Sequence, residues 1–321
     1  MEKALSGVWS KAGNAFNRCF SWSAPLAEFY LNAWALVLGL LPDENWLKAH
    51  VGNNLRNTTW PSLLFRPRKV ELAPNVEALF IPATGSVSLR ALYERRIRHE
   101  PGVPEFLRSR MSEYDAVLEI GANVGIYTLL FSKCLADRPP PASAPHRVFS
   151  FEPGTAAFAQ LEAHVALNAC SNVRAFNQAV AAKVGPIAFH ENTRDLMKSS
   201  THAGAAAQFA GWNKQATAVT AVTGREITPL LREFQRVLLK VDVVGAEAEV
   251  LKGLQPLIEE KAPDIVLGVW SHNLADLNAL AFLTSDYNFF RIEPARLAER
   301  SRFEDSTYCN YFLRHKRQAP C

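Results

Sequence analysis

The sequence predicts an α/β protein with a mostly parallel β-sheet that is covered by helices on both faces. From Tyr114 onward, short apolar runs alternate with stretches of helical periodicity, which is the pattern of strand–helix–strand units. One apolar run, residues 117–120, passes directly into a glycine turn that opens a helix. In such sheets, ligands bind beyond the carboxyl ends of the strands, where the strand order reverses.

Ahead of this domain, residues 1–68 predict a helical extension, and we assign residues 69–321 to the main domain. Apolar residues recur at spacings of three to four around Trp9 and Phe16 and again over residues 24–41. The segment 24–41 is strongly apolar but barely long enough to cross a bilayer. We favour a helix that is buried or faces a partner, which leaves a homodimer open; membrane association through this segment is the less favoured alternative.

Each element of the main domain follows from a local pattern. A hairpin is expected around Pro74, and residues 101–111 lead into the sheet. Two insertions interrupt the alternation: residues 137–147 predict a surface loop, and residues 192–215 predict either a substrate lid or a plain mobile loop. Strands are expected at residues 117–120, 148–151, 173–176, 237–241, 265–269, 289–292 and 310–313, and helices at 126–135, 155–168, 246–254 and 274–283.

Composition and cysteine spacing argue against several classes of protein and of binding site. The formal net charge is +4 and the basic residues are scattered, so the chain does not read as a nucleic-acid binder. The 5 cysteines are an odd number without a CxxC pair, which argues against a disulfide framework and a structural zinc site. No cluster of metal ligands has a recognisable spacing. With no secretory signal in the sequence, we expect a cytoplasmic protein.

The glycine turn carries the strongest chemical signal. Gly121, Asn123 and Gly125 follow an apolar strand and precede a helix. Glycine permits the tight turn and a close approach of the backbone to a ligand. The third glycine of the phosphate-binding GxGxxG pattern is absent, so the turn suits a ligand with a carboxylate and an amine better than a pyrophosphate. The alternative is that the glycines serve tight packing alone.

A carboxylate ends the next strand. Glu152 lies 152 − 125 = 27 residues after Gly125, whereas about 20 are expected in dinucleotide folds. The loop at residues 137–147 accounts for the excess. A carboxylate in this place can accept hydrogen bonds from both hydroxyls of a ribose. The alternative is a surface glutamate at a strand end.

Several motifs follow one another along the main domain. They are GANVGIYT at 121–128, SFEP at 150–153, LN at 167–168, NQAV at 177–180, LLKVDVVGAEAEVLKG at 238–253, SDYNFFRI at 285–292 and NYFLR at 310–314. In this order they resemble the FkbM-type methyltransferases. The resemblance implies a Rossmann-like, seven-stranded methyltransferase fold with a mostly parallel sheet and an antiparallel last strand. It also implies S-adenosyl-L-methionine as cofactor and methyl transfer to a hydroxyl of a sugar-like or secondary-metabolite acceptor, a small molecule or glycan.

The same resemblance assigns residues to the cofactor. The residues expected to line the methionine part are Glu119, Gly121, Asn123 and Gly125. Glu152 is expected to hold the ribose, and Asn177 and Ala179 are expected to border the adenine. Pro153 is a further expected cofactor contact. Asp242 ends the fourth strand next to the expected methyl position. Lys240 lies two residues earlier, on the same face of that strand.

The acceptor side departs from the family pattern. Val244 and Gly268 stand where the family commonly has glutamate, so two expected carboxylates are missing. An alcohol acceptor needs a proton acceptor within reach. The candidates for this role are His272, after the fifth strand, and Glu247, at the start of the helix that follows Asp242. His202 is a weaker candidate.

Two other functions remain open. A non-catalytic protein that binds S-adenosylmethionine fits the missing carboxylates. A nicotinamide-dependent oxidoreductase on a related fold is disfavoured by the GxNxG turn. The sequence leaves the acceptor, the oligomeric state and the purpose of the extension undetermined.

Overall fold

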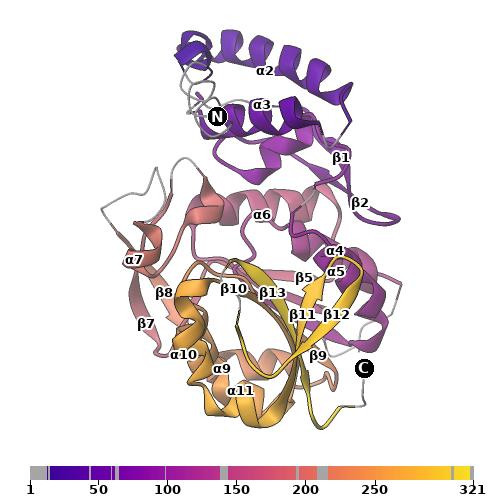
Figure 1. Ribbon diagram of the computed structural model, residues 1–321, viewed down its shortest axis with the longest axis vertical. Coiled ribbons are helices and arrows are strands. Elements are labelled where there is room, and N and C mark those ends of the chain that lie inside the picture. The colour runs from indigo at the N-terminus through magenta and orange to yellow at the C-terminus, as the bar shows by residue number, and fades with distance from the viewer. Residues whose placement is uncertain are drawn as a thin grey trace.

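The structure is a computed structural model that describes residues 13, 15–42, 45–58, 60–61, 65–97, 99–137, 144–192, 195–207, 216–304 and 307–318. Parts of both predicted insertions, residues 138–143, 193–194 and 208–215, lie outside the described residues, as do the first twelve residues of the extension. Figure 1 shows helices α2 and α3 at one end of the long axis and the large sheet at the other.

An eight-stranded sheet forms the centre of the main domain. Its order is β12-β11-β13-β10-β9-β3-β4-β5. The strands are β3 (Ala116–Ile120), β4 (Val148–Phe151), β5 (Val173–Phe176), β9 (Val237–Val241), β10 (Asp264–Val269), β11 (Tyr287–Glu293), β12 (Arg296–Arg300) and β13 (Cys309–His315). The strands from β10 to β5 pair in parallel, and β13 runs antiparallel to β10 and β11.

Seven of these strands confirm the predicted seven-stranded, Rossmann-like arrangement. The eighth, β12, forms a hairpin with β11. The sequence analysis missed it because its residues, RLAER, are polar and partly exposed, as is usual for an edge strand.

The strand order reverses at β3. The chain passes from β3 outward to β4 and β5 and then returns to the other side of β3 with β9. Ile120 and Val241, the last residues of β3 and β9, are paired in the ladder. The loops after β3 and β9 therefore meet at the switch point, where this class of sheet binds ligands.

Helices cover both faces of the sheet. The helix α9 (Glu247–Lys261) packs Leu251 and Leu254 on one face, and α5 (Ile126–Leu135) packs Leu129 and Leu130 on the other. The remaining helices of the main domain are α4 (Val103–Arg110), α6 (Thr155–Leu167), α7 (Ala203–Ala206), α8 (Gly224–Ile227), α10 (Leu274–Asn278) and α11 (Ala281–Asp286), with 3-10 helices at Met111–Glu113, Leu196–Lys198, Thr228–Leu231 and Ser271–Asn273.

Two helices differ from the prediction. α9 continues past the predicted end at Leu254 although it contains Pro256. Its Gly253 is needed for packing, because a Cβ there would lie 2.0 Å from the carbonyl oxygen of Ala181. The helix expected over residues 274–283 is instead two short helices, since the backbone of the buried Leu280 is extended.

A small three-stranded sheet lies between β5 and β9 in the chain and was not predicted. It contains β6 (Ala179–Val180), β7 (Gly185–Phe189) and β8 (Thr217–Val222) in the order β6-β8-β7. The strands are short, and most residues of β7 and β8 are exposed or only partly buried. The apolar pattern that marks a buried strand is therefore absent.

The extension contains residues 15–20, α2 (Ala24–Gly39) and α3 (Trp46–Asn57), followed by the hairpin of β1 (Arg68–Ala73) and β2 (Val76–Phe80) and the 3-10 helix Val87–Leu92. The inner face of α2 packs Tyr30, Leu31 and Leu38 against Trp60 and Leu89.

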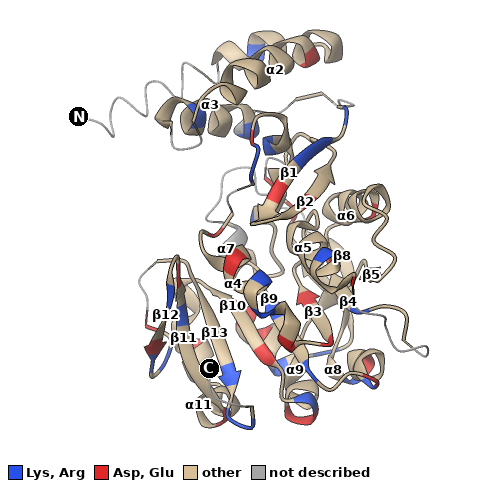
Figure 2. Ribbon diagram, turned by 90° about the vertical axis from the view of Figure 1, so that its right-hand side faces the viewer, with Lys and Arg blue, Asp and Glu red and all other residues tan. Residues whose placement is uncertain are grey.

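The outer face of α2 is apolar and exposed. Leu36, for example, is 75% exposed, and Trp22, Phe29 and Leu40 are exposed along the same side. The helix contains one charged residue, Glu28, and its ribbon is mostly tan in Figure 2, the colour of uncharged residues. Among the described residues, no helix combines the length and the hydropathy that a membrane span requires.

Candidate active site

The turn between β3 and α5 holds three residues at positive φ: Gly121 at 84°, Asn123 at 50° and Gly125 at 91°. A Cβ at position 121 would lie 2.1 Å from the carbonyl oxygen of Asp242. Gly121 therefore lets the ends of β3 and β9 pack directly against each other. Gly121 also lines the pocket described below, so the packing role leaves room for the cofactor role, which stays a prediction.

Asn123 presents an unsatisfied polar atom. The residue lines the pocket, and its Oδ1 is buried without a hydrogen-bond partner among the described residues. A buried polar atom of this kind calls for a ligand or ordered solvent. An ammonium or amide donor of a bound molecule would satisfy it.

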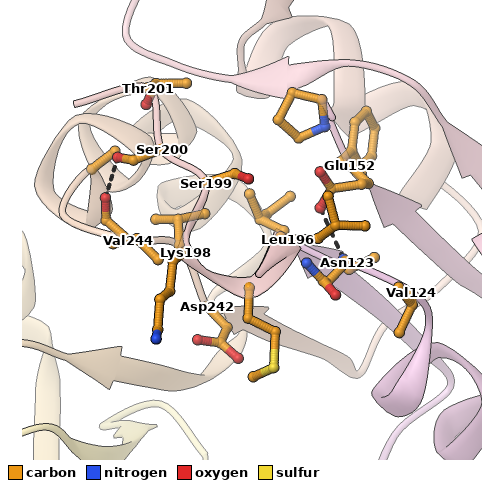
Figure 3. A pocket seen from close by; sticks show the side chains of 18 of the residues that line it. Asn123, Val124, Glu152, Leu196, Lys198, Ser199, Ser200, Thr201, Asp242 and Val244 are labelled. Carbon is orange, nitrogen blue, oxygen red and sulfur yellow. Dashed lines mark hydrogen bonds between the residues drawn. The ribbon is translucent and has the colours of Figure 1, made fainter. Parts of the chain in front are cut away.

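Glu152 is fixed by the same turn. Its Oε2 accepts the N–H of Asn123 at 2.8 Å, and its Oε1 accepts the N–H of Gly154 at 2.7 Å (Figure 3). Burial raises the pKa of Glu152 to about 7, although the two backbone hydrogen bonds lower it in part. The side chain of Asn177 holds the backbone behind it by donating to the carbonyl oxygens of Glu152 and Pro153 at 2.9 and 3.1 Å.

A pocket of about 310 Å³ opens at this switch point. This volume is at the lower end of the range for small-molecule sites, about 300–1,000 Å³. Six of the predicted site residues line it: Gly121, Asn123, Glu152, Pro153, Ala179 and Asp242.

The second insertion supplies another wall. Residues 195–201 line the pocket and pass close to Asp242 and Glu152 (Figure 3). Two hydrogen bonds hold the segment. The N–H of Leu196 donates to the carbonyl oxygen of Gly85, and the hydroxyl of Ser200 donates to the carbonyl oxygen of Val244. Its predicted role as a lid stays a prediction.

Six other predicted residues do not line the pocket: Glu119, Gly125, Asn177, Lys240, Glu247 and His272. Glu119 is buried behind the turn, where it accepts hydrogen bonds from Thr128 at 2.5 Å and Ser150 at 3.0 Å. Burial raises its pKa to about 7, and the charge of Lys240 opposes this shift. Glu119 therefore braces β3 against β4 and α5.

The two predicted acceptor-side residues Glu247 and His272 also lie outside the pocket. Glu247 is fully buried, accepts the N–H of Gly245 at 3.2 Å and is bonded by the side chain of Asn273; burial raises its pKa to about 8. His272 is exposed. The histidine that does line the pocket is His99.

Asp242 and Lys240 form an ion pair at the floor of the pocket. The Nζ atom of Lys240 donates to Oδ2 of Asp242 at 2.8 Å and lies 4.1 Å from the ring centroid of Tyr127. Burial alone would lower the pKa of Lys240, but Asp242, Glu100 and Glu119 together raise it. Lys240 is thus a buried cation beneath the site.

Glu100 is a second carboxylate beside this pair, and the sequence analysis missed it. It adopts a positive φ of 54°. It accepts hydrogen bonds from the hydroxyl of Tyr127 and the amide of Asn310, both at 2.6 Å, and from the hydroxyl of Tyr308. Burial alone would raise its pKa, but His99, Lys240 and the tyrosine hydroxyls lower it to about 2.

Tyr308 explains why position 268 is a glycine. A Cβ at Gly268 would lie 2.7 Å from the hydroxyl of Tyr308 and 3.1 Å from Oδ1 of Asp242. The hydroxyl itself lies 3.2 Å from that Oδ1 and is bonded to Glu100. The space beside Gly268 therefore holds Tyr308, whose hydroxyl is bonded to Glu100.

One group of potential metal ligands comes together only in the fold. Atoms of His99, Glu100 and Asp242 lie within 4.8 Å of one another. The sequence predicted no metal site, since Asp242 lies 242 − 100 = 142 positions after the adjacent His99 and Glu100. Lys240, which is bonded to Asp242, already places a positive charge beside them.

Other lining residues had no usable signal in the sequence. Arg56, His99 and Tyr308 all line the pocket. Arg56 lies in the last turn of α3, and His99 and Tyr308 lie in segments without regular structure. Each reaches the site through contacts that are distant in sequence, so no local spacing marks it.

The parallel sheet with its antiparallel last strand and the pocket beyond β3 and β9 define a Rossmann-like α/β protein of the methyltransferase class. The profile of the methyltransferase FkbM domain matches residues 119–290, which is more than half of the chain. The chain therefore belongs to the FkbM methyltransferase family. A search of curated proteins gave no match.

Solved structures give more distant likenesses. Methyltransferase FkbM from Methylobacillus flagellatus KT is 11% identical with a TM-score of 0.38; the alignment covers 91% of this chain and 60% of that one. The SAM-dependent methyltransferase from Agrobacterium tumefaciens is 11% identical with a TM-score of 0.38, over 87% and 80% of the two chains. A SAM-dependent O-methyltransferase from Thermotoga maritima is 13% identical with a TM-score of 0.30, over 70% and 69%.

Proposed function

We propose that this protein is an S-adenosylmethionine-dependent O-methyltransferase that acts on a hydroxyl of a sugar-like or secondary-metabolite acceptor. The pocket at the switch point, with Asn123 and Glu152 on the cofactor side and Asp242 facing them, carries this proposal. Family membership supports the reaction class.

The residues present fit the cofactor. The buried Oδ1 of Asn123 has no hydrogen-bond partner and suits the ammonium of an amino-acid tail. Each oxygen of Glu152 accepts one backbone N–H, and a carboxylate oxygen can accept a second donor, here a ribose hydroxyl. Pro153 and Ala179 line the wall expected to face the adenine.

The bound cofactor would supply an activated methyl group, and the chain would supply position and charge. Asp242 and the ion-paired Lys240 lie at the end of β9, beside the cofactor side of the pocket. An acceptor oxygen must approach to about 3 Å from the methyl carbon. Trp270 and Tyr308 line the region around Asp242 and would bind the acceptor. A neutral hydroxyl compound suits this side, because two carboxylates, Glu100 and Asp242, lie next to it.

Ligand binding gives the first test. S-Adenosylhomocysteine should raise the melting temperature of the protein, because a ligand that binds only the folded state stabilises it. NAD(H) should leave it unchanged. The variant Glu152→Ala should lose most of this stabilisation, whereas Glu249→Ala, which changes an exposed glutamate, should retain it. Stabilisation by NAD(H) alone would reverse the assignment to an oxidoreductase.

Methyl transfer gives the second test. Wild-type protein should transfer labelled methyl from S-adenosylmethionine to an acceptor in an extract of the source cells, and Asp242→Ala should abolish this transfer. Binding of S-adenosylhomocysteine without any methyl transfer would instead support the non-catalytic alternative.

A further inference from the structure

Resting on the proposed methyl transfer, we propose that His99 is the base that takes the proton of the acceptor hydroxyl and that Glu100 positions its ring. This assigns the catalytic base to a segment outside the matched methyltransferase region, residues 119–290. It replaces the sequence-based candidates His272 and Glu247 with a different histidine and a different glutamate.

The location of His99 is the first argument. Its ring lines the pocket together with Asp242, Trp270 and Tyr308. One atom each of His99, Glu100 and Asp242 lies within 4.8 Å of the other two. His99 is therefore next to the aspartate that marks the end of β9.

The orientation of the ring is the second argument. Nε2 of His99 lies 3.6 Å from Oε2 of Glu100. This separation is longer than a hydrogen bond. We assign the N–H of the ring to Nε2, on the side of Glu100, and the proton-accepting lone pair to Nδ1. Glu100 is itself fixed by Tyr127, Tyr308 and Asn310, so the pair is anchored to α5 and to the C-terminal strand region.

The backbone supports the same assignment. Glu100 has a left-handed φ of 54°, a conformation that is uncommon in a non-glycine residue. Three donors hold the side chain in place despite this strain. Strained residues of this kind cluster at active sites.

The balance of charges is the third argument. Glu100 and Asp242 are two carboxylates near one buried ammonium, that of Lys240. The carboxylate of Glu100 lies 3.6 Å from Nε2 of His99, so a negative charge faces the place where positive charge develops when the hydroxyl loses its proton.

The other acids are less suited to this role. Oδ2 of Asp242 accepts from Lys240, and Oδ1 lies 3.2 Å from the hydroxyl of Tyr308. Glu100 is enclosed by its three donors and does not line the pocket. Two further carboxylates line the pocket. Asp195 accepts the N–H of Met197 and pairs with Lys198, and Glu152 accepts two backbone N–H groups on the cofactor side. Among the described pocket residues, we therefore assign proton transfer to His99, which lies beside Asp242.

The step balances without a further reactant. The acceptor oxygen forms a bond to the methyl carbon while the carbon–sulfur bond breaks and its electron pair stays on sulfur. The hydroxyl proton passes to Nδ1 of His99. The products are a methyl ether, S-adenosylhomocysteine and an imidazolium, which later releases its proton to solvent.

A structure with S-adenosylhomocysteine bound tests the geometry without an acceptor. The oxygen must lie about 3 Å from the methyl carbon and within about 3 Å of its base. Nδ1 of His99 should therefore lie within about 6 Å of the vacant methyl position, with no side chain between them. A larger distance, or a ring turned away from the pocket, overturns the proposal.

Chemical rescue tests the chemistry. His99→Ala should lower the rate of methyl transfer about 100-fold or more and leave the calorimetric affinity for S-adenosylhomocysteine unchanged. Because the ring lines the pocket, added imidazole should enter the space it leaves and restore activity. The matched control His272→Ala should lose little activity and should not respond to imidazole. Full activity in His99→Ala, or a loss that imidazole cannot restore, overturns the proposal.

A double-mutant cycle tests the positioning role of Glu100. Glu100→Gln should lower methyl transfer in the wild-type background and have little further effect in His99→Ala, since residues that act through one another are not additive. If Glu100→Gln lowers methyl transfer equally in wild-type protein and in His99→Ala, Glu100 does not act through His99, and the positioning role is wrong.

The failures are distinguishable. If wild-type protein neither binds S-adenosylhomocysteine nor transfers methyl, the proposed function is wrong, and the assignment of His99 as the base is wrong with it. If wild-type protein transfers methyl and His99→Ala is equally active, only the base assignment fails.

Discussion

At the scale of single residues, Glu152 combines two tasks. Its carboxylate caps the backbone of the glycine turn through Asn123 and also faces the pocket in which we place the ribose. Burial raises its pKa to about 7, so its charge changes near neutral pH. A carboxylate accepts two hydroxyl donors, whereas a protonated carboxyl has less acceptor capacity.

Cofactor affinity should therefore depend on pH. As the pH falls below about 7, Glu152 takes up a proton and the affinity for S-adenosylhomocysteine should fall by up to about tenfold per pH unit; above that pH it should level off. Titration calorimetry from pH 5.5 to 8.5 measures this. Glu152→Gln should bind more weakly and with less pH dependence. A wild-type affinity that does not change with pH would contradict the role of Glu152.

The residue scale also shows what the sequence could and could not predict. The turn residues and Glu152 were predictable, because a strand end and a glycine turn are local patterns. Glu100 was not, because its partners Tyr308 and Asn310 are 208 and 210 positions away. Glu119 and Lys240 were assigned to the site by motif, yet both lie beneath the pocket surface, which the periodicity of a fully buried strand cannot reveal.

At the scale of elements, α6 and the hairpin strand β2 are joined by Asn168, part of the LN motif. Its Nδ2 donates to the carbonyl oxygen of Leu79 and its Oδ1 accepts the N–H of the same residue, both at 2.8 Å. His164, one turn earlier, contacts the backbone of Ile81 and of Val124. These contacts tie the glycine turn to the hairpin.

Removing this link should destabilise the domain. Asn168→Ala leaves two backbone groups of β2 without partners, and we expect the free energy of unfolding to fall by about 2 kcal/mol. Denaturant titration measures it. Asn288→Ala, at an exposed position of β11, should change it by less than about 0.5 kcal/mol. Equal effects of the two substitutions would show that the Asn168 contacts contribute no net stability.

At the scale of the whole molecule, the extension has its own apolar cluster. Leu31 and Leu38 of α2 pack with Trp60 and with Leu89 of the 3-10 helix, apart from the two clusters that cover the sheet. The extension also supplies Arg56 to the pocket lining. The extension therefore contributes a side chain to the site, but it is stabilised by an apolar cluster of its own.

Local unfolding should follow this division. Leu31→Ala should destabilise the extension by about 2–5 kcal/mol, so that residues 24–57 exchange amide hydrogens faster while β3 and α5 keep their protection. Hydrogen exchange with mass spectrometry measures both regions. Leu36→Ala, at an exposed position on the same helix, is the control. A parallel loss of protection in β3 would show a single cooperative unit.

The crowded corner around Gly268 has a consequence for how relatives of this chain are sorted. Tyr308 occupies the room that a longer residue would need at that strand end, and the negative charge is brought there by Glu100 from an earlier stretch of the polypeptide. A comparison of active-site residues position by position would class such a chain as lacking an acid on the acceptor side. A comparison of the charged side chains that lie together in the structure would find the carboxylate. A search for enzymes of this kind should therefore include sequences that supply the acid from another segment.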